Sequence, residues 1–135
     1  MVSSGTNPTV TPHSGSQLAK FNSYDATSGA QTRYYRSSGF SVASTYTTVT
    51  LTFWMYHDTG YSTSADKVQA QVSTNGGTSF TSVGTAVNRY DGSTGWKQHT
   101  VDLSAYKGTT VTLGFLGTSA YGNNVFLDDV TVTAQ

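Results

Sequence analysis

The sequence predicts an all-β fold: an antiparallel two-sheet β-sandwich with the jelly-roll arrangement and about eight strands. Three observations predict it. Short stretches that alternate apolar and polar residues recur along the 135 residues. Turn sequences rich in Gly, Asn and Asp separate these stretches. No stretch has the 3.6-residue apolar periodicity of an amphipathic helix. A jelly roll would also pair the first strand with the last.

The strongest strand signal lies at residues 48–57, which we expect to form a central strand. Apolar residues at alternate positions fall on one side of the pleat and predict a face buried in the core. Trp54 and Tyr56 fall on the other side. This strand therefore offers two aromatic rings to a ligand, to a covering segment or to water.

The other predicted strands take their bounds from the same alternation. Asn75-Gly76-Gly77 is the clearest hairpin turn, because its backbone needs positive φ angles that Asn and Gly tolerate. Residues 1–12 are rich in Ser, Thr and Pro and are predicted to be a linker tail, followed by a single domain at 13–135. The remaining strands are expected at 18–23, 31–40, 68–73, 80–87, 96–103, 111–115 and 125–133.

Composition excludes several classes of function. Charged residues make up 10% of the chain and its net charge is zero, so it lacks the basic surface that nucleic acids or anionic lipids require. No apolar run approaches the roughly 20 residues that span a bilayer. The chain has no cysteine and therefore no disulfide. Low charge with abundant Ser, Thr, Gly and Tyr is typical of secreted bacterial β-modules, so we expect a monomer that is secreted or held at the bacterial cell surface.

Several motifs occur in a familiar order between residues 13 and 133. They include the hairpin of residues 73–80, Ser-Thr-Asn-Gly-Gly-Thr-Ser-Phe, and the ending Leu-Asp-Asp-Val at residues 127–130. Together they resemble the MAM-like jelly-roll modules of secreted bacterial proteins, including the cleaved-adhesin domains of secreted peptidases. The resemblance implies a non-catalytic accessory module that often holds a structural calcium ion. The sequence departs from the pattern in lacking cysteine and in having Phe80 where many such modules have Trp.

The acidic residues are the candidate metal ligands. Asp128 shares the phase of the apolar residues around it, so an unbroken strand would point it inward, where an unpaired carboxylate is costly. Calcium binding would compensate, since calcium takes several carboxylate and carbonyl oxygens. Asp129 could join through a bulge, and Asp66 and Asp58 flank a polar loop that could add ligands. Alternatively, Asp128 caps backbone N–H groups or pairs with a basic residue at a strand end.

A second candidate site is a sugar-binding face. Trp54 and Tyr56 would share it with Gln69 and Gln71, which fall on the outward phase of the next strand. Flat rings stack on the C–H faces of sugars, and amides hydrogen bond to sugar hydroxyls. The alternative is that a loop or the N-terminal segment covers the two rings, since large aromatic residues are usually well buried.

Tyrosines are numerous and could make an adhesive surface, although scattered tyrosines are also ordinary in extracellular β-modules. The candidates are Tyr24, Tyr34, Tyr35, Tyr46, Tyr61, Tyr90 and Tyr121.

The sequence does not favour catalysis. The three histidines, His13, His57 and His99, are predicted in a tail, at a strand end and within a strand. Gly-x-Ser-x-Gly and His-Glu-x-x-His motifs are absent. We therefore expect no enzymatic activity from this chain.

The main functional expectation is an accessory binding or adhesion module of a secreted hydrolase, a peptidase in particular, stabilised by calcium. The first alternative is a carbohydrate-binding module that uses the aromatic face, and the second is a structural adhesin repeat. Its partner would be an extracellular protein or polysaccharide, or neighbouring domains of the parent chain.

Overall fold

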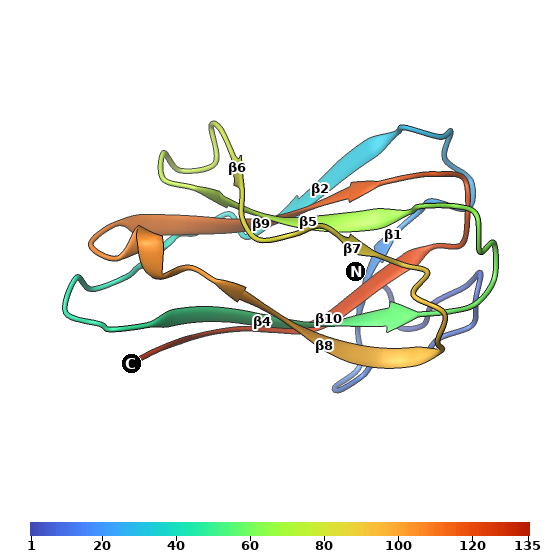
Figure 1. Cartoon of the computed structure of the whole chain (residues 1–135), viewed down its shortest axis with the longest axis horizontal. Helices are drawn as coiled ribbons and strands as arrows, with labels where there is room; N and C mark the ends of the chain where they lie inside the picture. Colours follow the sequence, from blue (N-terminus) through green and yellow to red (C-terminus); the bar gives the residue numbers. More distant parts are fainter.

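A computed structural model describes all residues, 1–135, as two antiparallel β-sheets packed face to face (Figure 1). The all-β sandwich prediction is confirmed. One three-residue 3-10 turn, η1 (Ser104–Tyr106), is the only helical element, and no helix has the length and apolar character to cross a membrane. The strands are β1 (Ala19–Phe21), β2 (Gln31–Tyr35), β3 (Phe40–Ser41), β4 (Val49–His57), β5 (Lys67–Ser73), β6 (Thr81–Ser82), β7 (Val87–Asn88), β8 (Gly95–Asp102), β9 (Thr110–Thr118) and β10 (Val125–Ala134).

The strand order is that of a jelly roll. The first sheet has the order β1-β10-β4-β8, and the second has β2-β9-β5-β6, with β3 also on β9 and β7 also on β5. If β2 with β3 and β6 with β7 each count as one interrupted strand, the ten strands become eight, in the orders 1-8-3-6 and 2-7-4-5. The predicted pairing of the first and last strands is present, because β1 pairs with residues 125–127 of β10.

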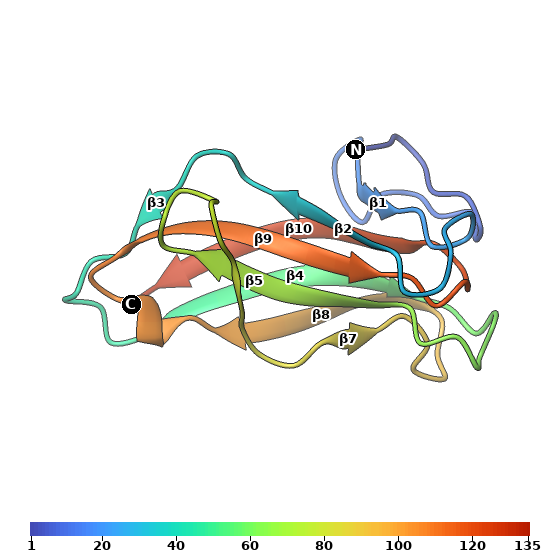
Figure 2. The same ribbon diagram turned by 90° about the horizontal axis from the view of Figure 1, so that it is seen from above.

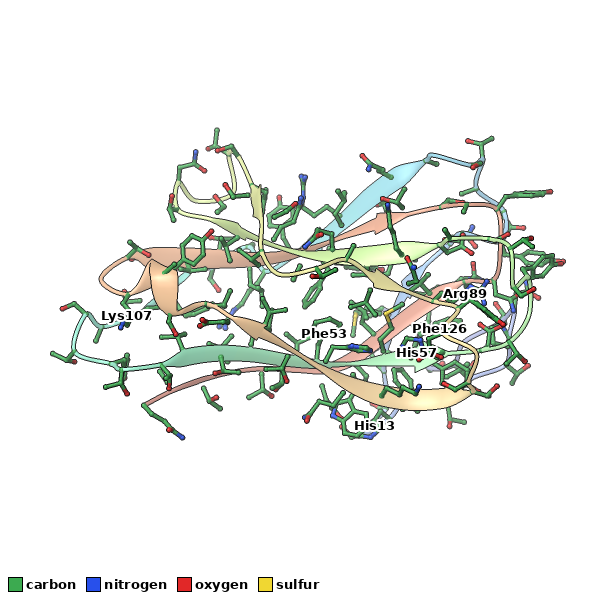
Figure 3. The ribbon with its side chains drawn as sticks, in the orientation of Figure 1. His13, Phe53, His57, Arg89, Lys107 and Phe126 are labelled. Atoms are coloured by element: carbon green, nitrogen blue, oxygen red, sulfur yellow. The ribbon has the colours of Figure 1, made fainter.

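The core lies between the two sheets and follows the predicted alternation in β4. Every second residue of β4 is buried, and Phe53 lies between the two sheets (Figure 3). Its ring packs edge to face against Phe115 of the opposite sheet, with ring centroids 5.1 Å apart. Gly117 lets a third ring enter, since a Cβ atom there would lie 2.3 Å from Cδ1 of Phe21. The inner face of β4, the strand predicted to be central, therefore forms part of the core, as expected from the sequence.

The prediction of a linker at residues 1–12 is wrong. The segment folds back next to β1 and packs on the outer face of the first sheet (Figure 2). Isolated bridges join Val2 to Leu18 and Gly5 to Val10. Val10 and Leu18 bury Phe126 in a second, smaller apolar cluster. Scattered apolar residues are thus enough to hold a Ser- and Thr-rich segment on the sheet.

The inward orientation expected for Asp128 is also wrong. Asp128 lies opposite Trp54 in the register of β10 and β4, so it shares the outer face of the first sheet. A bulge follows, in which Asp129 has φ 45°. Beyond it, Val132 lies opposite the buried Leu51 and turns back to the core. The extra residue changes the phase within β10, which the alternation of an unbroken strand does not reveal.

Candidate functional site

Arg89 is the buried centre of the end of the sandwich where β4 finishes and β5 and β10 begin (Figure 3). Its side chain has 0% exposure and makes two ion pairs. Nη1 lies 2.9 Å from Oδ2 of Asp58, and Nε lies 3.2 Å from Oδ2 of Asp66. Because both carboxylates are buried as well, the guanidinium is the charge that compensates them.

The same guanidinium fixes the β4–β5 loop. Nη1 donates to the carbonyl oxygen of Gly60 at 2.8 Å, and Nη2 donates to that of Tyr61 at 3.1 Å. Oδ1 of Asp58 also accepts the backbone N–H of Gly60 at 2.9 Å. The loop backbone at residues 58–61 is therefore held from within by charge-assisted hydrogen bonds.

Asp66 and Asp58 fix the β9–β10 loop in the same way. Oδ1 of Asp66 accepts the backbone N–H groups of Ala120 at 2.7 Å and Gly122 at 3.2 Å. Oδ1 of Asp58 accepts Nδ2 of Asn123 at 2.7 Å. One buried ionic network, which comprises Arg89, Asp58 and Asp66, thus positions two loops that are far apart in the sequence.

Three exposed tyrosines lie on the loops at this end, and we call them the tyrosine cluster. Tyr24 is in the β1–β2 loop, Tyr61 in the β4–β5 loop and Tyr121 in the β9–β10 loop, with exposures of 38%, 53% and 64%. The rings of Tyr24 and Tyr61 are 6.3 Å apart between centroids. The phenol of Tyr61 is the main cause that raises the pKa of Tyr24, and burial, Asp25 and Tyr121 add smaller contributions in the same direction.

Two of these tyrosines have a backbone conformation that favours glycine. Tyr61 has φ 47° and Tyr121 has φ 60°. A non-glycine residue in this region costs about 1–3 kcal/mol and persists only where the surroundings impose it. Here Arg89 holds the carbonyl of Tyr61, and Asp66 accepts the N–H groups on either side of Tyr121, whose own N–H donates to the hydroxyl of Ser119 at 3.0 Å. The network therefore maintains two strained residues that present large exposed rings.

The predicted aromatic face is present but covered. Trp54 and Tyr56 lie on the outer face of the first sheet, and His13 stacks on Trp54 with ring centroids 3.9 Å apart and an interplanar angle of 18°. The indole N–H of Trp96 beside them donates to the carbonyl of Thr11 at 3.3 Å. The structure thus has the arrangement given as the alternative, in which the N-terminal segment covers the rings.

Gln69 and Gln71 do not share that face, and the expectation that they do is wrong. They belong to β5, which lies in the second sheet, whereas Trp54 and Tyr56 belong to β4 in the first. The loop between β4 and β5 crosses from one sheet to the other instead of forming a hairpin. Gln71 instead accepts a hydrogen bond from Nε of Arg33, at 2.7 Å.

The four candidate calcium ligands form two separate groups. Asp58 and Asp66 hold Arg89, while Asp128 and Asp129 hold the N-terminal segment. Oδ2 of Asp128 accepts the backbone N–H of His13 at 2.8 Å, and Oδ2 of Asp129 lies 2.6 Å from Nδ1 of His13.

Each of the eight carboxylate oxygens accepts a hydrogen bond from the protein. No three His, Cys, Asp or Glu side chains gather where they could hold a metal ion. The four residues therefore do not fit one calcium ion, and calcium binding stays a prediction. Arg89, which was not singled out from the sequence, supplies the positive charge between Asp58 and Asp66.

His57 and His99 form a pair beside the network. Their Nε2 atoms are 3.0 Å apart, and Nδ1 of His57 lies 2.9 Å from the carbonyl oxygen of Arg89. A carbonyl only accepts, so His57 donates through Nδ1 and its Nε2 accepts the proton of His99. Burial lowers the pKa of both rings, and the proximity of His57 lowers that of His99 further. The neutral pair ties β8 to the base of the ionic network.

Comparison with known proteins gives structural likeness alone. No family model and no curated protein matches the sequence. Among solved structures, the module TmCBM61 in complex with beta-1,4-galactotriose has a TM-score of 0.57 and 17% identity, covering 91% of this chain and 74% of that one. A family 16 carbohydrate-binding module has a TM-score of 0.46, 13% identity and coverages of 90% and 79%.

The CBM22-1 xylan-binding domain of Xyn10C from Paenibacillus barcinonensis has a TM-score of 0.45, 13% identity and coverages of 87% and 94%. At 17% identity, the likeness to TmCBM61 supports the β-sandwich fold of this chain. TmCBM61 is not described as a MAM-like or peptidase-associated domain, and the resemblance to such modules stays a prediction.

Proposed function

We propose that this chain is a non-catalytic carbohydrate-binding module and that the tyrosine cluster is its binding site. The observation that carries the proposal is the convergence of Tyr24, Tyr61 and Tyr121, from three different loops, on a buried ionic network that holds two of them in a strained backbone. Strained residues concentrate at ligand sites, where the surrounding structure imposes them. The shared fold with a module solved in complex with a galactotriose also supports it.

The chemistry of the cluster suits an uncharged saccharide. Exposed phenol rings offer flat apolar surfaces for sugar C–H faces, and their hydroxyls can donate to and accept from sugar hydroxyls. Tyrosine adds this area at a small entropic cost, because it has only two side-chain torsions. The carboxylates below the cluster, Asp58 and Asp66, point inward to Arg89. The cluster therefore offers polar and aromatic groups of preset geometry, which lowers the cost of binding.

Within this proposal the module attaches a secreted bacterial hydrolase to its polysaccharide. The composition supports the secretion part of the proposal, and the resemblance to accessory modules supports the parent hydrolase. A small convergent set of rings suits a few units of a polymer chain better than the broad, flat contact typical of two proteins. This favours the saccharide over the protein partner of a peptidase-associated module.

Isothermal titration calorimetry with neutral oligosaccharides tests the proposal, after a screen of polysaccharides that includes β-1,4-galactan and xylan. Tyr61→Ala and Tyr121→Ala should each weaken binding by at least about tenfold, because tyrosines at the centre of an interface often contribute more than 1.4 kcal/mol. Tyr46→Ala is the matched control, since Tyr46 is exposed on the β3–β4 loop at the opposite end, which Lys107 marks in Figure 3.

Two results would contradict the proposal. One is the absence of binding to every polysaccharide of the screen. The other is an equal loss of affinity in the Tyr46→Ala control. Release of reducing sugars from any bound polysaccharide by the purified chain would refute the non-catalytic part of the proposal.

A further inference from the structure

The outer face of the second sheet, formed by β2, β9 and β5, is positively charged. Figure 2 looks down on this sheet. Arg33 and Lys67 lie on it, in β2 and β5. None of the seven aspartates of the chain lies in a strand of this sheet, whereas the strands of the first sheet include Asp102, Asp128 and Asp129. The chain has no net charge, yet the only charged residues in the strands of this sheet are basic, and we call this surface the basic face.

Arg33 is held in a fixed position on this face. Its Nε donates to Oε1 of Gln71 at 2.7 Å, and its guanidinium carbon lies 4.4 Å from the ring centroid of Phe80. Gln71 is itself buried and donates to the hydroxyl of Ser82 at 3.4 Å. The terminal Nη1 and Nη2 groups of Arg33 make no hydrogen bond within the protein. The guanidinium is thus oriented by two contacts, while both of its terminal NH2 groups stay free to donate to a ligand.

An exposed aromatic ring lies next to this guanidinium. Tyr35 is two residues from Arg33 in β2, so both point to the same side of the sheet, and Tyr35 is 56% exposed. Its ring packs edge to face against Phe80, with centroids 5.6 Å apart. Gly114 makes this approach possible, because a Cβ atom there would lie 2.9 Å from Cε1 of Phe80 and 3.3 Å from Cβ of Tyr35.

From this geometry we propose that the basic face is a second binding site, specific for saccharides that carry a uronic acid. The sugar ring stacks on Tyr35 and its carboxylate accepts two parallel hydrogen bonds from Nη1 and Nη2 of Arg33. Lys67 adds positive charge that attracts a polyuronate chain along the sheet. This site lies on the side of the sandwich and shares no residue with the tyrosine cluster at its end.

Calorimetry with oligogalacturonides, repeated at low and high salt, tests the proposal on the full chain. Wild-type protein should bind, and its affinity should fall as the salt concentration rises. Arg33→Met should weaken binding by at least about tenfold, since a hydrogen bond to a charged group contributes about 1.5–3 kcal/mol. Arg36→Met is the matched control, because Arg36 is exposed on the same sheet edge and its Nε bonds only to Ser38. Melting temperatures verify that both variants are folded.

The outcomes separate this site from the tyrosine cluster. If Arg33→Met abolishes oligogalacturonide binding but leaves neutral saccharide binding intact, the basic face is supported. The proposal is overturned if Tyr61→Ala removes oligogalacturonide binding while Arg33→Met does not. It is also overturned if the wild type does not bind oligogalacturonides. Dextran sulfate distinguishes a uronate site from a general anion site, and binding it as tightly as the uronate overturns the proposed specificity. If the wild type binds oligogalacturonides but no neutral saccharide, the result counts against the tyrosine cluster and leaves this inference standing.

Discussion

Arg89→Met removes the positive charge of the ionic network while it keeps a side chain of similar length. The change leaves Asp58 and Asp66 buried without their cation, and it removes hydrogen bonds to two carboxylates and three loop carbonyls. Breaking a buried ion pair by removing one partner costs about 3–5 kcal/mol. The carboxylates keep their other donors, so we expect a loss within this range. For a domain of this size, the loss corresponds to a melting temperature lower by about 10–20 °C.

Chemical and thermal unfolding followed by circular dichroism at pH 7 measures this effect. Arg36→Met is the matched control, because its guanidinium is exposed, and its free energy of unfolding should change by at most about 0.5 kcal/mol. Adding Asp58→Asn and Asp66→Asn to Arg89→Met should recover part of the lost stability, because no buried charge then remains uncompensated. A loss below about 1 kcal/mol for Arg89→Met would refute the view that the network is a principal source of stability.

Three further predictions concern the same fold. Folding lowers the pKa of His57 and of His99, so the unfolded chain binds protons first as the pH falls. The free energy of unfolding should therefore be full above a pH of about 6.5 and decrease below it. A melting temperature that stays constant between pH 5 and 8 would contradict this. Gly117→Ala forces a methyl group into the ring of Phe21 and should lower the free energy of unfolding, measured in urea, by about 1–3 kcal/mol. Gly29→Ala is the control without steric overlap, because no atom lies near its Cβ position, although its positive φ adds a backbone cost of its own. A saturating chelator should leave the melting temperature unchanged if Arg89 replaces a metal; a lower melting temperature that added calcium restores would instead support the calcium prediction.

The alternation of apolar residues was sufficient to predict the sandwich, because a period of two fixes which face of each strand is buried. It could not predict which sheet a strand joins. Gln69 and Gln71 have the outward phase that the sequence indicates, yet the β4–β5 loop carries them to the second sheet. Likewise, the side of the sheet on which Asp128 lies depends on the bulge that follows it. Asp129 forms this bulge with a positive φ angle, which the apolar alternation of the sequence does not indicate.

The candidate site was predictable only in its parts. Asp58 and Asp66 were singled out as residues flanking a polar loop that could add calcium ligands, but both pair with an arginine that lies 31 and 23 residues away, respectively. Nothing local in the sequence connects them, since the contact forms only when β7 pairs with β5. The tyrosines were noted as a scattered set. Their convergence depends on three loops that meet at one end of the sandwich, which is a property of the topology.

The fold of the N-terminal segment has a practical consequence for shortened versions of the chain. The rings of Tyr56 and Trp96 pack against the small apolar cluster that includes Val10, and Trp96 also donates to the carbonyl of Thr11, so a boundary placed at residue 13 would remove part of their cover. A version beginning after residue 16 would also lose His13, which stacks on Trp54 and contacts both carboxylates of β10, and it would display a bare aromatic stripe. Such a fragment would self-associate or adhere to surfaces, and its apparent stickiness could then be mistaken for ligand recognition.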